Sequence, residues 1–222
     1  MRSILVVART QLFPRLSPQG FLPAGSVDLD ALAPHLFFAE RAYMEQCSHF
    51  KQIIPYLVLT RASGGAPRVL AYQRRGDHSE QRLGGLWSIG FGGHIEPLDR
   101  ADAGVAARGL VRAAALRELA EETGLSVAPE RLRPLGCINS DREDVSSVHF
   151  GVVYGVDLDV LPESDEAVAQ TVVAQAEPHR VRWLPQAALP GLLGPGRGPD
   201  GGDFEDWSRI VIEGAFAPGA AR

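Results

Sequence analysis

Residues 117–125 read Arg117-Glu118-Leu119-Ala120-Glu121-Glu122-Thr123-Gly124-Leu125, with three carboxylates between residues 118 and 122. Residues three or four apart are neighbours on a helix, so Glu118 is expected to lie beside both Glu121 and Glu122. Like charges at that separation repel, and the single guanidinium of Arg117 cannot neutralise all three. A divalent cation that takes oxygen ligands, such as Mg²⁺, can do so. The stretch therefore predicts an acidic helix that binds a metal ion.

The residues around these carboxylates predict a helix that ends at Gly124. Val111, Ala115 and Leu119 recur at four-residue spacing and form an apolar stripe suited to packing on a sheet. Gly124 stands where a left-handed C-terminal cap is expected. A solvated acidic face is the alternative interpretation, and it is the usual one for an isolated Glu-Glu pair. Three carboxylates on one turn beside an arginine favour the metal site.

A second stretch lies upstream, where residues 92–96 read GGHIE. Together the two stretches resemble the box of the Nudix superfamily, the MutT-like pyrophosphohydrolases. That box runs glycine, five residues, glutamate, seven residues, and then Arg-Glu-apolar-any-Glu-Glu-any-Gly-apolar. Gly93 fits the opening glycine, and residues 117–125 fit the whole second half. Flanking strand patterns extend the resemblance over about residues 50–185, and the lead-in from residue 88 is similar to a subgroup of predicted MutT-type phosphoesterases.

The resemblance implies a metal-dependent hydrolase. By it, the main-chain carbonyl of Gly93 and the carboxylates of Glu118, Glu121 and Glu122 would bind Mg²⁺, or alternatively Mn²⁺, and Arg117 would orient Glu118 through a salt bridge. The ions would neutralise charge on phosphate oxygens and activate a water molecule. The implied reaction is attack of water on phosphorus in a phosphoanhydride. The implied substrate class is a nucleoside diphosphate linked to another group.

The sequence departs from the family pattern at two places. Asp99 stands where the box has a glutamate, and seventeen residues, 100 to 116, separate it from Arg117 where the family has seven. As a direct metal ligand, Asp99 would have a shorter reach and the number of bound ions would change; as a brace for the loop, it would alter little. The inserted run Arg100–Arg112 predicts either a longer loop or extra helical turns before the acidic helix.

Other polar residues are candidates for substrate contact or for the general base. For substrate we consider His94, Asp99, Arg74 and His149, although a structural histidine or a solvated arginine explains the same residues equally well. Trp87, Arg75 and Arg142 are further candidates whose spacing is not diagnostic. The base is expected either among the glutamates of the box or on a later segment, where solvated charges are the alternative interpretation. That segment contains Glu163, Asp165, Glu166, Glu177 and His179.

Hydrophobic runs predict a mixed α/β protein. The expected strands are Ser3–Ala8, Lys51–Thr60, Arg68–Arg74, Ser88–Ile95, Leu132–Asn139, Ser147–Asp157 and Arg180–Leu184. With the acidic helix and a C-terminal helix that contains Trp207, they imply the family's α/β/α sandwich with a mixed sheet. Asp203 is expected to cap that last helix. We divide the single predicted domain into an N-terminal extension (1–48), a Nudix core (about 50–185) and a C-terminal helix and tail (186–222).

The N-terminal extension is expected to contain a helix around Pro34–Gln46. Its buried face would be formed by Leu36, Phe37, Tyr43 and Met44. Added core is the plainest interpretation of an apolar stripe. A lid over the active site or a homodimer contact is the alternative.

Composition points to a compact protein of the reduced cytoplasm. The 222 residues can bury a substantial core, and no apolar run approaches the roughly 20 residues of a membrane span. The chain has two cysteines, Cys47 and Cys137, and neither a disulfide framework nor a zinc site is indicated. The net charge is −5 and the basic residues form no cluster with interleaved aromatics, so nucleic acid is not expected as the main partner.

Two other functions fit the same fold. A non-catalytic ligand sensor would explain the split box and Asp99, but neither terminus shows a DNA-binding module. An isoprenoid diphosphate isomerase would need proton-transfer groups on opposite sides of the substrate, for which Cys137 is a weak candidate. Metal-dependent turnover separates enzyme from sensor, and phosphate release separates hydrolase from isomerase.

Overall fold

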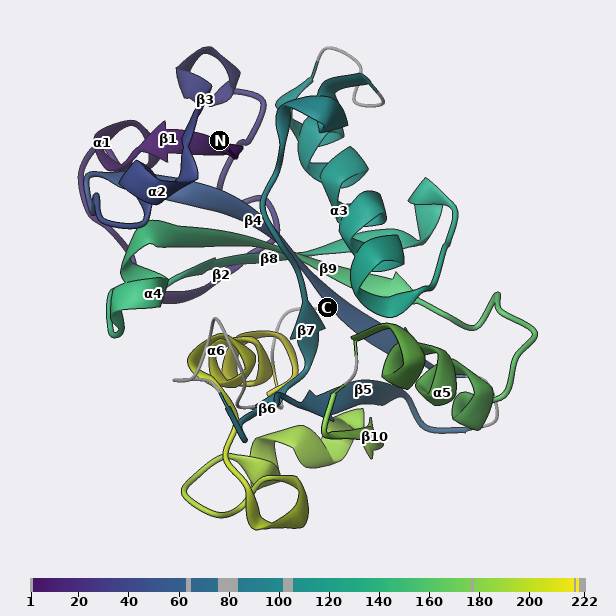
Figure 1. The fold of residues 1–222 in the computed structure, drawn as a ribbon. Coiled ribbons are helices and arrows are strands. Elements are labelled where there is room, and N and C mark those ends of the chain that lie inside the picture. Colours follow the sequence, from purple (N-terminus) through teal and green to yellow (C-terminus); the bar gives the residue numbers. More distant parts are fainter. Residues whose placement is uncertain are drawn as a thin grey trace.

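A mixed β-sheet runs through the whole protein. A computed structural model of the chain describes residues 2–62, 65–75, 84–101, 106–176, 178–217 and 219 (Figure 1). The strands are β1 Ser3–Ala8, β2 Gly20–Pro23, β3 Leu36–Glu40, β4 Phe50–Arg61, β5 Arg68–Gln73, β6 Trp87–Ser88, β7 Gly90–Phe91, β8 Leu132–Asn139, β9 His149–Asp157 and β10 Arg180–Pro185. The α-helices are α1 Arg9–Leu12, α2 Arg41–Met44, α3 Ala107–Thr123, α4 Asp144–Val148, α5 Asp165–Ala176 and α6 Asp206–Ala215.

The long strand β4 is the centre of the sheet. The main strand order is β10-β5-β4-β9-β8-β2, with β1 and β7 also paired to β4, β3 to β1, and β6 to β5. The ladder between β4 and β9 is parallel, and the other ladders in the described part of the chain are antiparallel. A strand with neighbours on both sides and layers on both faces must be apolar almost throughout, which explains the continuous run of buried residues in β4.

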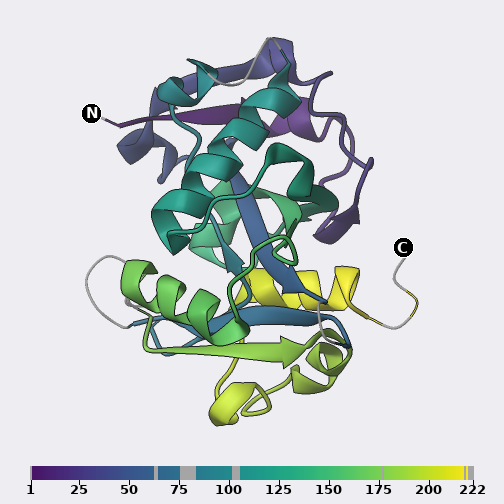
Figure 2. The same cartoon turned by 90° about the vertical axis from the view of Figure 1, so that its right-hand side faces the viewer.

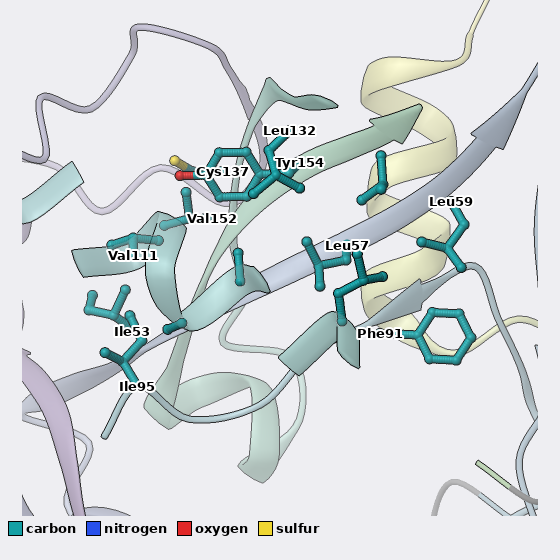
Figure 3. Packing of buried hydrophobic residues seen from close by; sticks show 14 of the residues in the cluster. Ile53, Leu57, Leu59, Phe91, Ile95, Val111, Leu132, Cys137, Val152 and Tyr154 are labelled. Atoms are coloured by element: carbon teal, nitrogen blue, oxygen red, sulfur yellow. The ribbon is translucent and has the colours of Figure 1, made fainter. Parts of the chain in front are cut away.

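Helices cover both faces of the sheet, as expected for an α/β/α sandwich. The first apolar cluster joins one face of the sheet to α3 and α5, and the second joins the other face to α6. Alternate residues of β4 enter the two clusters, and Figure 3 shows Ile53, Leu57 and Leu59 on the α3 side. Figure 2 shows α3 and α5 together on one side of the sheet and α6 on the other. The predicted fold class is confirmed.

The insertion in the box extends the acidic helix at its N-terminal end. Helix α3 begins at Ala107, ten residues before Arg117, so residues 107–112 of the inserted run form extra helical turns. Residues 102–105 of the insertion lie outside the described part of the chain. Val111, Ala115 and Leu119 are buried as predicted, and Gly124 ends the helix with a φ of 71°. The acidic turn therefore lies at the C-terminal end of α3.

The predicted helix at Pro34–Gln46 is wrong. Residues 36–40 form strand β3, which pairs with β1, and the only α-helix in that range is the single turn α2. Phe37 is 42% exposed and Tyr43 is 71% exposed, so they do not form a buried face. A short strand and a short helix can have apolar residues at the same positions, so the weak helical periodicity did not distinguish them. Pairing with β1 favours the strand. The extension thus adds strands and buried core residues such as Leu5 and Val7.

Three smaller expectations also differ. Strand Ser88–Ile95 breaks into β6 and β7, and residues 92–96 form a loop. Asp203 does not cap α6, because Glu205 is the N-cap residue and the Asp203 carboxylate accepts a hydrogen bond from the Gly196 N–H instead. Helix α5 was not expected. No helix in the described part of the chain is long and apolar enough to cross a membrane.

Candidate metal-binding and catalytic site

The three carboxylates of α3 differ in exposure. Glu118 is 6% exposed and lies on the buried side of the helix, whereas Glu121 and Glu122 are exposed. This follows from helix geometry, because Glu118 comes four residues after the buried Ala114 and three after the buried Ala115, and so lies on the same side of the helix. Only one carboxylate is therefore held in place by packing.

Arg117 connects the acidic turn to the loop before it. Its Nη1 donates to Glu118 Oε1 and to Glu121 Oε2, each at 2.8 Å. Its Nη2 donates to the main-chain oxygen of His94 at 2.8 Å. Its Nε and Nη2 donate to the two carboxylate oxygens of Asp99 at 2.7 and 3.1 Å. Burial lowers the pKa of the guanidinium, but Asp99 and Glu118 outweigh this effect and the net pKa is raised. Arg117 therefore stays charged and forms a salt bridge with Glu118, which is the contact that the resemblance implied.

Asp99 is hydrogen-bonded both to Arg117 and to the loop before it. It is 3% exposed, and Oδ2 also accepts a hydrogen bond from the Glu96 N–H at 2.8 Å. Both carboxylate oxygens are therefore bonded to Arg117, and one of them also to the loop that carries Gly93. Of the two roles left open by the sequence, this geometry supports bracing, and the shorter side chain is no handicap for it.

The glycines of the loop allow the backbone to lie against Glu118. A Cβ at Gly93 would lie 2.3 Å from Glu118 Oε2, and a Cβ at Gly92 would lie 2.1 Å from the main-chain oxygen of Pro55. Both separations are far below van der Waals contact, so a side chain at either position would displace the loop. The backbone of the loop is thus in close contact with β4 at Gly92 and with the Glu118 carboxylate at Gly93.

The oxygen donors of this turn fit a hard divalent cation. Burial raises the pKa of the Glu118 carboxyl; Arg117 opposes the rise, and the nearby Glu122 and Glu121 add to it. A cation beside Glu118 would favour its charged form and relieve the repulsion. Carboxylate and main-chain oxygens are the ligands that Mg²⁺ and Mn²⁺ prefer. In the described residues, no group of three or more His, Cys, Asp or Glu side chains is arranged to hold a metal ion, and Glu118 and Glu121 both turn toward Arg117.

His94, in the loop of residues 92–96, lies next to His149. His94 Nε2 is 2.7 Å from Gln52 Oε1 and 3.4 Å from His149 Nε2, and His149 Nδ1 is 2.6 Å from the Val145 oxygen. Burial lowers the pKa of both imidazoles, to about 3 for His94. Both rings are therefore neutral at pH 7, where they can serve only as neutral hydrogen-bonding groups.

Arg74 lies beside Tyr72. Its guanidinium is 5.7 Å from the centre of the Tyr72 ring. Burial raises the pKa of the Tyr72 hydroxyl, Arg74 lowers it and Glu122 contributes to the rise, so this hydroxyl lies within reach of both charges. The sequence did not identify Tyr72, and its only signal was its place two residues before Arg74.

The proposed general bases lie around α5. Asp165 pairs with Arg61 and Arg68, so its carboxylate is already occupied. Glu163 and Glu166 are exposed at the start of α5, His179 is exposed after its end, and Glu177 lies outside the described residues. The C-terminal end of α5 meets the acidic helix, since Gln175 Nε2 donates to the Glu121 oxygen at 2.7 Å. The C-terminal end of α5 is therefore a better location for a general base than its N-terminal end.

Cys137 does not fit proton transfer. It is 7% exposed within the first apolar cluster, and burial raises the pKa of its thiol to about 12. A thiol that is neutral and packed in the core has no access to a substrate. The isomerase hypothesis thus has no support from this residue.

Comparisons with known proteins identify relatives of this chain in sequence and in fold. Protein YmaB of Bacillus subtilis (strain 168) is 28% identical over 174 residues, which cover 78% of this chain and 75% of that protein. The crystal structure of Tm1382, a candidate Nudix hydrolase, has a TM-score of 0.63 and 25% identity, and the match covers 95% of this chain and 96% of that one. A NUDIX hydrolase from Alicyclobacillus acidocaldarius has a similar fold, with a TM-score of 0.55, 17% identity and coverage of 77% and 93%. The NUDIX domain model matches residues 53–202, more than half of the chain, and the chain therefore belongs to the NUDIX domain family.

Proposed function

We propose that this protein is a metal-dependent hydrolase that cleaves a phosphoanhydride bond in a nucleoside diphosphate linked to another group. One observation carries the proposal: Arg117 fixes the buried Glu118 carboxylate against the Gly93 backbone, with two further carboxylates on the same turn. A solvated acidic face needs neither the buried carboxylate nor the glycine that makes room for it. The fold and the family match support the same activity.

The metal ligands would be the carboxylates of Glu118, Glu121 and Glu122 and the carbonyl of Gly93. When bound, Mg²⁺ or Mn²⁺ would neutralise charge on the phosphate oxygens and lower the pKa of the attacking water, worth several kcal/mol. Arg117 holds Glu118 and the His94 carbonyl in fixed relation, so the ligands are positioned before substrate arrives.

The substrate contacts would come from both sides of this turn. Arg74, whose guanidinium lies beside the Tyr72 ring, would bind a phosphate group. The neutral His94 and His149 would donate or accept hydrogen bonds on the leaving portion of the substrate.

The same observations weaken the sensor alternative. It was motivated by Asp99 and by the insertion in the box. Asp99 is bonded to Arg117, and the described residues 107–112 of the inserted run lie in α3 at the end away from the acidic turn. Neither departure disturbs the predicted ligands.

The experiment is turnover across a panel of nucleotide sugars, ADP-ribose, NADH, dinucleoside polyphosphates, coenzyme A and nucleoside triphosphates. Each is assayed with Mg²⁺ or Mn²⁺ and with EDTA. We expect at least one linked nucleoside diphosphate to be cleaved, EDTA to abolish cleavage, and Glu122→Gln to lower kcat by about 10³ because several kcal/mol of stabilisation are lost.

The matched control is Glu213→Gln, the same substitution at an exposed position of α6. It should leave kcat unchanged. Turnover that persists in EDTA, or that survives in Glu122→Gln, would contradict the proposed function.

A further inference from the structure

A buried polar cluster lies on the α6 side of the sheet, across from the acidic helix. We call it the Glu205 clamp, and it consists of Tyr56, Ser88, Glu205 and Ser208. Glu205 is 7% exposed, and its Oε1 accepts hydrogen bonds from Ser88 Oγ at 2.8 Å and from Ser208 Oγ at 2.9 Å. The Tyr56 hydroxyl donates to the same oxygen at 2.9 Å. A buried carboxylate is costly unless several donors satisfy it, and here three hydroxyls do so.

The Glu205 clamp is hydrogen-bonded to the backbone at Ile89 and at Gly90, the first residue of β7. Ser208 Oγ, which donates to Glu205, accepts a hydrogen bond from the Ile89 N–H at 2.9 Å. Ser88 Oγ accepts one from the Gly90 N–H at 3.3 Å. The Gly90 oxygen is taken by the Tyr72 hydroxyl at 3.0 Å. The Gly90 N–H and carbonyl are therefore bonded by Ser88 and Tyr72, and the Ile89 N–H before them is bonded by Ser208 of α6.

The gripped residues lead directly into the glycine loop. Gly90 lies flat on the Tyr56 ring, because a Cβ there would lie 2.1 Å from two ring carbons. Two residues later, at Gly92, the backbone lies in close contact with β4, and at Gly93 it lies in close contact with Glu118. At the far end of the loop Arg117 binds the His94 oxygen. The loop is thus fixed at one end by Arg117 and at the other by the clamp.

We propose that Glu205 and Ser208 are positioning residues for the metal site, acting through Ile89 and Gly90 on the Gly93 backbone from the opposite face of the sheet. This inference rests on the proposed function, since it assumes that the Gly93 carbonyl and Glu118 bind the ion. Glu205 and Ser208 lie beyond residue 202, where the family match ends, so the family pattern does not assign them this role. In Figure 1 α6 lies beside β6 and β7, which is the contact that the clamp needs.

A purely structural cluster would stabilise the fold without acting on the metal site, and two variants separate these roles. Ser208→Ala and Tyr56→Phe each remove one hydroxyl donor from Glu205. Only Ser208→Ala also removes the acceptor of the Ile89 N–H, whereas Tyr56→Phe keeps the ring under Gly90 and leaves the backbone bonds intact.

The readout is the affinity for Mn²⁺ alone, measured from the electron paramagnetic resonance signal of the free ion. It is taken at a temperature where thermal unfolding curves show every variant to be folded. We expect Ser208→Ala to bind Mn²⁺ about tenfold more weakly than the wild-type protein, by analogy with the loss of groups that orient metal ligands. Tyr56→Phe should bind it like the wild-type protein. If Ser208→Ala does not fold, Glu205→Gln, which keeps the size of the side chain, should weaken binding by about threefold or more.

The outcomes are distinct. Mn²⁺ binding by the wild-type protein that is lost in Glu122→Gln and weakened in Ser208→Ala supports the positioning role. Equal Mn²⁺ affinity in Ser208→Ala, Tyr56→Phe and the wild-type protein overturns the clamp and leaves the proposed function standing. A wild-type protein that does not bind Mn²⁺ overturns the proposed function and the positioning role with it.

Discussion

Replacing Asp99 with asparagine tests whether the acidic turn depends on its brace. The substitution keeps the size of the side chain but removes its charge, and it puts an amide donor where an oxygen now accepts. The Asp99 carboxylate has three hydrogen bonds within 3.1 Å, two from Arg117 and one from the Glu96 N–H. At least one of them must be lost, because the amide has a single acceptor oxygen.

The magnitude follows from the burial of the pair. Removing one partner of a buried ion pair costs about 3 to 5 kcal/mol. Arg117 is 17% exposed and keeps its bonds to Glu118 and Glu121, so its charge is not left uncompensated. We therefore expect a loss of about 2 kcal/mol in the free energy of unfolding, which for a chain of this size corresponds to a fall in Tm of roughly 4 to 8 °C.

The assay is urea unfolding, with Asp157→Asn as the matched control. Asp157 pairs with Arg131 at 3.3 Å, and both side chains are 44% exposed, so its loss should cost less than about 1 kcal/mol. Asp99→Asn should also weaken Mn²⁺ binding about tenfold, because Arg117 is no longer held in place. Equal losses of stability in the two variants, together with wild-type Mn²⁺ affinity in Asp99→Asn, would refute the bracing role.

Two further predictions follow from the loop and its histidines. Gly93→Ala should weaken Mn²⁺ binding by about tenfold or more, because a Cβ would lie 2.3 Å from Glu118 Oε2; Gly191→Ala, where no atom lies within 4 Å, should leave binding unchanged, and equal behaviour of the two would count against the close approach. The pKa of His94 is lowered to about 3, so the folded state binds fewer protons than the unfolded state between that pH and 6.5. The contribution of His94 to the free energy of unfolding should therefore be complete above pH 6.5 and fall by about 1 kcal/mol per pH unit below it. Urea unfolding at a series of pH values should show a smaller dependence of the free energy of unfolding on pH for His94→Gln. An unchanged dependence would contradict the lowered pKa of His94.

Local pattern was enough to predict most of the elements. Strands Ser3–Ala8 and Leu132–Asn139 have the predicted bounds. The first is a continuous apolar run, which indicates burial on both faces, and Ile4–Val7 are buried. Helix α3 was predicted from its stripe and its terminal glycine. The error at Pro34–Gln46 arose where the run is short and its strand character depends on a partner, β1, supplied by tertiary pairing. The division of the chain near residues 48 and 185, the cytoplasmic location and the homodimer stay predictions.

The sequence by itself determined the acidic helix, the glycines before it and the family, because residue spacing on one helix and the space around a glycine are local properties. Only the tertiary structure decided which distant residues contact this helix and these glycines. Asp99 and Arg117 are 18 residues apart in the chain, and Ser88 and Glu205 are 117 apart, so their contacts depend on how the sheet and helices pack. No periodicity encodes such distant pairs. Burial selects them, because a charge or hydroxyl enclosed by the fold must find its partner there.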